Sequence, residues 1–125
     1  MRIDAGGAFG VTRGASASVG GNFTVSNGGT IRYEVEQGSQ SGAVAVAGDT
    51  SLAATGTVDV VSALSAQKLP SRSTLVVTQG TTVEPESYEG WQTILNGSEK
   101  FRGTLELDGN ALNLLCKRGL YFIFR

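Results

Sequence analysis

An internal repeat constrains the fold of this chain more than any other feature of its sequence. Residues 19–25 align without gaps on residues 46–52, and residues 29–33 align on residues 56–60, so the two copies are 27 residues apart. Four aligned pairs are identical: Val19 and Val46, Gly21 and Gly48, Gly29 and Gly56, and Thr30 and Thr57. Repeats of this length are typical of solenoids, in which each coil buries its apolar row against the next. A chance match in Gly-, Thr- and Val-rich sequence is the alternative, but turn residues match as well as apolar ones.

The repeat also predicts which side chains lie next to one another. In a parallel solenoid, Val25 stacks on Leu52 and Ile31 stacks on Val58, at the spacing of about 4.8 Å between strands. An antiparallel β-sandwich, the alternative architecture, places these residues on strands with other partners. If the period held along all 125 residues, the chain would form between four and five coils.

Short alternating segments predict that the whole chain is built of β-strands. In residues 30–36, Ile31, Tyr33 and Val35 fall on one face and charged residues fall on the other. Further strand-like runs occupy residues 57–61, 73–78, 91–95, 104–107 and 111–115, with glycine-containing turns between several of them. Only residues 61–69 are compatible with a turn or two of helix, which Pro70 would end. We therefore expect an all-β fold.

Composition removes several classes of function. Ten basic and eleven acidic side chains leave a net charge of −1, whereas nucleic acids and anionic membrane surfaces attract basic proteins. No apolar run is long enough to insert this segment into a bilayer. The chain has no histidine and a single cysteine, Cys116, so histidine-based triads, histidine-containing zinc sites and internal disulfides are excluded. We expect no catalytic residues, no metal site, no cofactor and no nucleic-acid partner.

The length fits one domain. We expect residues 1–125 to form a single β-domain, in which residues 1–78 are repeat coils and residues 79–125 are less regular C-terminal coils and a cap. Four to five coils are close to the minimum for a solenoid, and open ends of a solenoid need capping. The chain is therefore interpreted as the terminal piece of a longer rod.

The second half of the chain resembles a known family. Residues 88–97 contain a tyrosine-led strand with Ile94 and Leu95, and residues 101–114 contain Phe-x-Gly-Thr and two leucine strands around Asp-Gly-Asn. This pattern resembles the end of autotransporter-type β-helix passengers, and more closely the autotransporter-associated β-strand repeat proteins of bacterial surfaces. The resemblance covers roughly residues 19–115. It implies a right-handed parallel β-helix that serves as a scaffold and ends in a closing cap.

Tyr88 and Trp91 are the aromatic pair with the character of a ligand site. Sugar-binding proteins stack pyranose rings on exposed tryptophan and tyrosine side chains. An extended chain places these two residues on opposite faces, but a turn at Glu89 and Gly90 would bring them together. The alternative, which we favour, is that they close the open end of the core or pack under a loop.

Other candidate residues have simpler interpretations. Glu84, Glu86 and Glu89 surround a proline in a loop-like stretch, where a solvated face is favoured over an acid–base pair or a calcium site. Cys116 follows a leucine strand and is expected to be buried and inert. Asn22 begins one glycosylation sequon and Asn96 another, as expected by chance in a Ser- and Thr-rich chain.

The most hydrophobic stretch of the chain lies near its C-terminus. It consists of Leu120, Tyr121, Phe122, Ile123 and Phe124. Such a run must be covered on both faces or must cover something itself. We favour a central strand or a cap over the open end of the core. The alternative is an edge strand that pairs with another protein chain.

These observations favour a non-enzymatic, structural β-solenoid that acts as a scaffold or adhesion stalk of a bacterial cell-surface or secreted protein. The Gly-, Ser- and Thr-rich, cysteine-poor composition suits that location, although a cytoplasmic location stays open. A carbohydrate-binding β-sandwich module that contacts surface glycans is the alternative. An enzyme ranks third, because it would need a carboxylate pair that the sequence does not localise.

Overall fold

The computed structural model describes residues 1–11, 17–36, 39–40, 43–63, 69, 71–98 and 103–116. Within these ranges the fold is all-β, and no helix is present. The described part of the chain therefore offers no helical segment that would cross a bilayer. Two sequence predictions fall largely or wholly outside the described residues, namely the short helix within residues 61–69 and the apolar run at residues 120–124.

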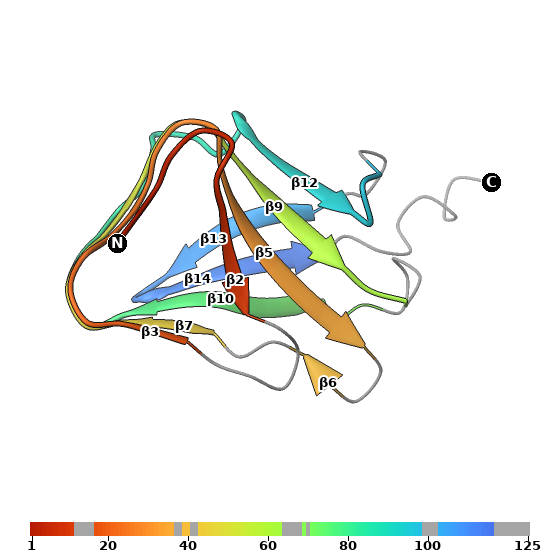
Figure 1. Ribbon diagram of the computed structural model, residues 1–125, viewed down its shortest axis with the longest axis horizontal. Helices are drawn as coiled ribbons and strands as arrows, with labels where there is room; N and C mark the ends of the chain where they lie inside the picture. The colour runs from red at the N-terminus through yellow and green to blue at the C-terminus, as the bar shows by residue number, and fades with distance from the viewer. Residues whose placement is uncertain are drawn as a thin grey trace.

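The strands form three sheets, which enclose one interior (Figure 1). Sheet A contains β1 (Arg2–Ile3), β4 (Phe23–Val25), β8 (Thr50–Leu52) and β11 (Thr82–Val83). Sheet B contains β2 (Ala8–Val11), β5 (Gly29–Glu36), β9 (Gly56–Val61) and β12 (Trp91–Leu95), with β6 (Ser39–Gln40) paired to the end of β5. Sheet C contains β3 (Ala17–Val19), β7 (Val44–Val46), β10 (Arg72–Thr78), β14 (Ala111–Cys116) and β13 (Gly103–Asp108).

The chain visits these sheets in a fixed order. After β1 and β2, three successive passes each contribute one strand to sheet C, then one to sheet A, then one to sheet B. The strands of neighbouring passes pair in parallel in all three sheets. In Figure 1 the bends of successive passes lie on top of one another at the left of the view.

The register agrees with the sequence repeat where the repeat was found. Val25 lies opposite Leu52, and Ile31 lies opposite Val58, so the predicted stacking is confirmed. The 27-residue period does not extend along the whole chain, because the connections between strands differ in length. Partners are 22, 27, 32 and 35 residues apart in the pairs Arg2 and Thr24, Phe23 and Thr50, Thr50 and Thr82, and Gly56 and Trp91.

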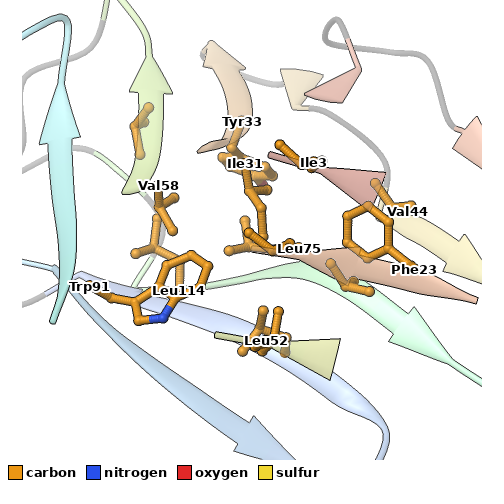
Figure 2. Packing of buried hydrophobic residues seen from close by; sticks show 14 of the residues in the cluster. Ile3, Phe23, Ile31, Tyr33, Val44, Leu52, Val58, Leu75, Trp91 and Leu114 are labelled. Atoms are coloured by element: carbon orange, nitrogen blue, oxygen red, sulfur yellow. The ribbon is translucent and has the colours of Figure 1, made fainter. Parts of the chain in front are cut away.

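The core is built from the inward-facing side chains of all three sheets (Figure 2). The predicted alternation in β5 is confirmed, because Ile31, Tyr33 and Val35 are buried while Arg32 is exposed. Phe23 of sheet A is completely inaccessible to solvent, and its ring centroid lies 5.9 Å from that of Phe9 on β2. Burial of such rows supplies the apolar free energy that holds one pass against the next.

Side chains at the corner between sheets C and A tie the passes together. The Oδ1 atom of Asn22 accepts a hydrogen bond from the backbone N–H of Asp49 at 2.9 Å. The Oδ1 atom of Asp49 in turn accepts one from the N–H of Thr81 at 2.8 Å. A side chain at Gly48 would place its Cβ 2.8 Å from the carbonyl of Gly21, so glycine allows this close stacking of corners.

A β-hairpin reverses the strand direction at the C-terminal end of sheet C. β14 is antiparallel to β10, and β13 is antiparallel to β14, with Gly109 at a positive φ of 62° in the turn. On the outer face, Arg72 of β10 contacts Glu106 of β13 at 3.0 Å, and Thr74 donates to Asn113 of β14 at 2.7 Å. On the inner face, Leu112 and Leu114 of β14 are buried in the core.

Candidate binding cleft

The corner between sheets A and B is longer in the last pass than in the earlier ones. Residues 26–28 and 53–55 make this connection in the two preceding passes, whereas residues 84–90 make it between β11 and β12. The pairing offset accordingly rises from 32 residues at Thr82 to 35 residues at Trp91. The longer corner contains Tyr88 and the three glutamates that the sequence singles out.

A turn in this corner brings Tyr88 and Trp91 together. The backbone N–H of Trp91 donates to the carbonyl of Tyr88 at 2.9 Å, which closes the turn over Glu89 and Gly90. The two ring centroids are 6.4 Å apart, and the ring planes meet at 73°, so the rings pack edge to face. This geometry is a favourable one for aromatic pairs. The structure therefore contains the turn at Glu89 and Gly90 that would bring the two rings together.

Trp91 is held in place as part of the core. Only 8% of the residue is exposed, and its indole N–H donates to the carbonyl of Ala53 at 2.9 Å. The ring lies against Gly56 on the strand below, where a Cβ atom would come within 2.6 Å of a ring carbon. These contacts agree with the interpretation of Trp91 as a core or cap residue. A ligand-binding role for this residue stays a prediction.

Tyr88 is half-buried, and its polar end differs from that of Trp91. Its hydroxyl oxygen is inaccessible to solvent and makes no hydrogen bond of regular geometry, although the carboxylate of Glu84 lies next to it. Burial raises the pKa of Tyr88 above its usual value of 10.0, and the neighbouring carboxylate of Glu84 raises this pKa further. The phenol therefore stays protonated at neutral pH, where it can donate a hydrogen bond to the Glu84 carboxylate.

The aromatic pair lines a cleft of about 480 Å³ between the long corner, β12 and β13. Its lining residues are Ser87, Tyr88, Glu89, Trp91, Thr93, Gly103, Thr104 and Leu105. Thr93 connects the two strands, because its Oγ1 atom accepts from the N–H of Gly103 and donates to the carbonyl of Gly103, each at 3.1 Å. The volume lies within the range of small-ligand pockets in proteins.

The remaining sequence candidates lie outside this cleft or at its rim. Glu84, Glu86 and Glu89 are all exposed, as expected for a solvated loop face. Cys116 is buried, which agrees with an inert structural role. In the described ranges, no group of three or more Cys, Asp and Glu residues is arranged to hold a metal ion.

Both sequon asparagines have structural partners. Asn22 holds the corner described above, and the Oδ1 atom of Asn96 accepts from the N–H of Ser62 at 2.9 Å. The Nδ2 atom of Asn96 also donates to the carbonyl of Ser62. These contacts connect consecutive passes, so both side chains serve the stacking of the fold.

The far wall of the cleft, which belongs to β13, was not predicted from the sequence. Thr104 and Leu105 were assigned to a strand but not to a site, because their approach to Tyr88 depends on how β13 lies relative to β12. The available groups are hydroxyls, one carboxylate, two aromatic rings and an aliphatic side chain, which suit the binding of apolar or hydroxyl-bearing groups.

Comparisons of the chain with protein-family models, with curated proteins and with solved structures each return no match.

Proposed function

We propose that this chain is a right-handed parallel β-helix with a structural role, as a non-enzymatic scaffold segment of a bacterial surface or secreted protein. The observation that carries the proposal is the in-register parallel pairing of successive passes in three sheets. The proposed hand rests on the rule that parallel crossover connections are right-handed in nearly all proteins. The parallel pairing of Val25 with Leu52 supports this architecture over an antiparallel sandwich.

The physical properties of such stacking suit a scaffold. Each pass contacts only its neighbours, so the architecture is quasi-one-dimensional and lengthens by about 4.8 Å with each added pass. Inward positions hold the passes together, whereas outward positions such as Thr24 and Ser51 in sheet A do not fill the core. Outward side chains are thus free to vary without loss of the fold.

A paired substitution tests the scaffold architecture. The double variant Thr24→Lys and Ser51→Glu, which changes two outward-facing residues, should leave the unfolding midpoint nearly unchanged. The substitution Val25→Asp, at an inward-facing position, should abolish cooperative unfolding. Urea denaturation followed by circular dichroism measures both. Equal tolerance at the inward and outward positions would contradict the proposed stacking.

The proposed location has its own test. Antibodies raised against the purified chain should label intact cells of the source organism or its culture medium, with a cytosolic marker as the control. Labelling that requires permeabilised cells and is absent from the medium would contradict a surface or secreted role.

The cleft next to Tyr88 favours a second candidate function, which is carbohydrate binding. The scaffold proposal expects no saturable binding of the purified chain to a glycan array. Saturable binding that is lost in Tyr88→Ala but kept in Glu86→Ala, a variant in the same corner that does not line the cleft, would favour the glycan-binding module instead.

A further inference from the structure

The cleft beside Tyr88 lies at the C-terminal end of the stack, where the three sheets end at different levels. Sheet A ends with β11 and sheet B ends with β12, whereas sheet C continues through β14 to β13 (Figure 1). The cleft is lined by residues of β12, of β13 and of the long corner before β12. Among them Glu89 and Thr104 are exposed, so a dissolved molecule has access to the cleft.

The two aromatic rings of the cleft form a corner. The planes of Tyr88 and Trp91 meet at 73°, and the ring centroids are 6.4 Å apart. In this edge-to-face arrangement, one face of each ring bounds the angle between them. The face of an aromatic ring is electrically negative and attracts a cation that lies within about 6 Å of the ring centroid. A single cation in this corner can therefore contact both rings.

Trp91 is already fixed in position for such a contact. Its indole N–H donates to the carbonyl of Ala53 at 2.9 Å, and its ring lies against Gly56 on β9. Because the protein itself holds the indole, a ligand that contacts it does not have to order a mobile side chain. This lowers the entropic cost of binding.

Carboxylates make this cleft attractive to positive charge. Glu89 is the one charged residue among the described residues that line the cleft. The carboxylate of Glu84 lies next to the hydroxyl of Tyr88, and it polarises the phenol so that the ring becomes richer in electrons. The stretch of residues 81–98 contains three glutamates and no lysine or arginine. Its charge is therefore complementary to that of a cation.

We propose that the cleft binds an organic cation that carries a methylated ammonium group. Tyr88 and Trp91 contact its methyl groups, and the carboxylate of Glu89 balances its charge. Such a group holds water weakly, so the two rings and the partly buried Leu105 can replace its hydration shell, whereas a small inorganic cation would lose strongly bound water. The cleft, at about 480 Å³, is larger than the group alone and leaves room for the rest of the ligand. This binding function is independent of the proposed scaffold role.

Choline is the probe for a test on the unmodified chain. Its neutral carbon analogue, dimethylbutanol, is the matched control, because it has the same shape without the charge. Trp91 is the single tryptophan of the chain, so its emission reports on the cleft, and isothermal titration calorimetry is the second readout. Choline should bind in a saturable manner, and the neutral analogue should bind about tenfold more weakly. Equal affinities for the two compounds, or no saturable choline signal by either method, would overturn the proposal.

Substitutions in the long corner test individual side chains. Glu89→Gln should weaken choline binding about threefold, whereas Glu86→Gln, in the same corner but outside the cleft, should leave the affinity nearly unchanged. Tyr88→Phe should weaken binding less than Tyr88→Leu, because phenylalanine keeps an aromatic face. Equal losses in the two glutamate variants would contradict binding in the cleft.

Two further comparisons identify the ligand that carries the cation. Tighter binding of a trimethyl-lysine peptide than of choline would assign the ammonium group to a modified protein, and the reverse order would assign it to a free small molecule. Saturable glycan binding without choline binding would assign the cleft to a sugar and overturn the proposal. That outcome would not affect the proposed scaffold, which is tested by the outward and inward substitutions above.

Discussion

The second and third passes of the chain differ from its last pass and hairpin in one consistent way. Between residues 17 and 61 the two passes have connections of matched length, and every paired position is 27 residues from its partner. After residue 71 the connections lengthen, and the final strands of sheet C run antiparallel. Stacking of the passes therefore tolerates connections of different length, because the inward apolar rows and the corner hydrogen bonds set the register.

The burial of inward-facing side chains also differs between these two regions. An inward residue in the middle passes is covered by a pass on each side, so Val25, Ile31 and Val58 are almost inaccessible to solvent. At the C-terminal end one of these covers is missing in the described structure, and Leu95 and Leu105 are only partly buried. Substitutions of inward-facing residues should therefore cost more stability in the middle passes than at the C-terminal end.

The largest effect is expected for Phe23→Ala in the regular region. Removal of this fully buried ring leaves a cavity next to Phe9 and should lower the free energy of unfolding by about 3–5 kcal/mol. Leu105→Ala at the open end should cost clearly less in the same urea denaturation experiment. If the two variants lost equal stability, the described difference in burial would not reflect the protein in solution.

A smaller effect is expected for Gly56→Ala, at the junction of the two regions. The new methyl group meets the packed ring of Trp91 and should cost about 1–3 kcal/mol of stability through overpacking. Gly20→Ala is the control, because no atom lies within 4 Å of a Cβ built there. A shift of Trp91 emission in the first variant, and none in the second, identifies the ring as the displaced group.

The hydroxyl pair of Thr50 and Thr78 links the regular region to the last pass inside the core. Their Oγ1 atoms are 2.6 Å apart, and both residues are buried. Thr50→Val should lower stability by about 1–2 kcal/mol, because it leaves the Thr78 hydroxyl buried without this partner. The double variant with Thr78→Val should recover part of the loss. A double-mutant cycle in which the two costs simply add would show that the hydroxyls are not coupled.

The smallest effect on stability at neutral pH is expected for two tyrosines, Tyr33 in the regular region and Tyr88 in the last pass. Burial is the main cause that raises the pKa of Tyr33 and of Tyr88 above 10.0. As the pH rises past the unfolded pKa of about 10, the unfolded state loses these protons first, so the free energy of unfolding falls. Below that pH both states are protonated and stability is unaffected.

Urea midpoints measured at about pH 8 and about pH 11 check this expectation. The variants Tyr33→Phe and Tyr88→Phe should each reduce the loss of stability between the two pH values. A wild-type midpoint that does not fall at the higher pH would contradict the raised pKa values.

Much of the fold was predictable because its signals are local. The alternation in residues 30–36, the turn at Gly109 and the strand at Trp91–Leu95 depend on side-chain period and glycine placement, and each is found where it was expected. The candidate site was predictable only in part. Tyr88 and Trp91 were named, but the opposite wall of the cleft belongs to β13, whose position depends on a pairing across the sheet.

By itself the sequence determined the class of fold, the inward rows and the register of the two regular passes, because the 27-residue repeat places equivalent residues on adjacent strands. Only the tertiary structure decided where that repetition stops. β13 precedes β14 in the chain, yet β14 pairs with β10 and leaves β13 at the edge, next to the cleft. Packing of the whole core selects which strands pair here, so no local pattern in the sequence predicts that β14 pairs with β10.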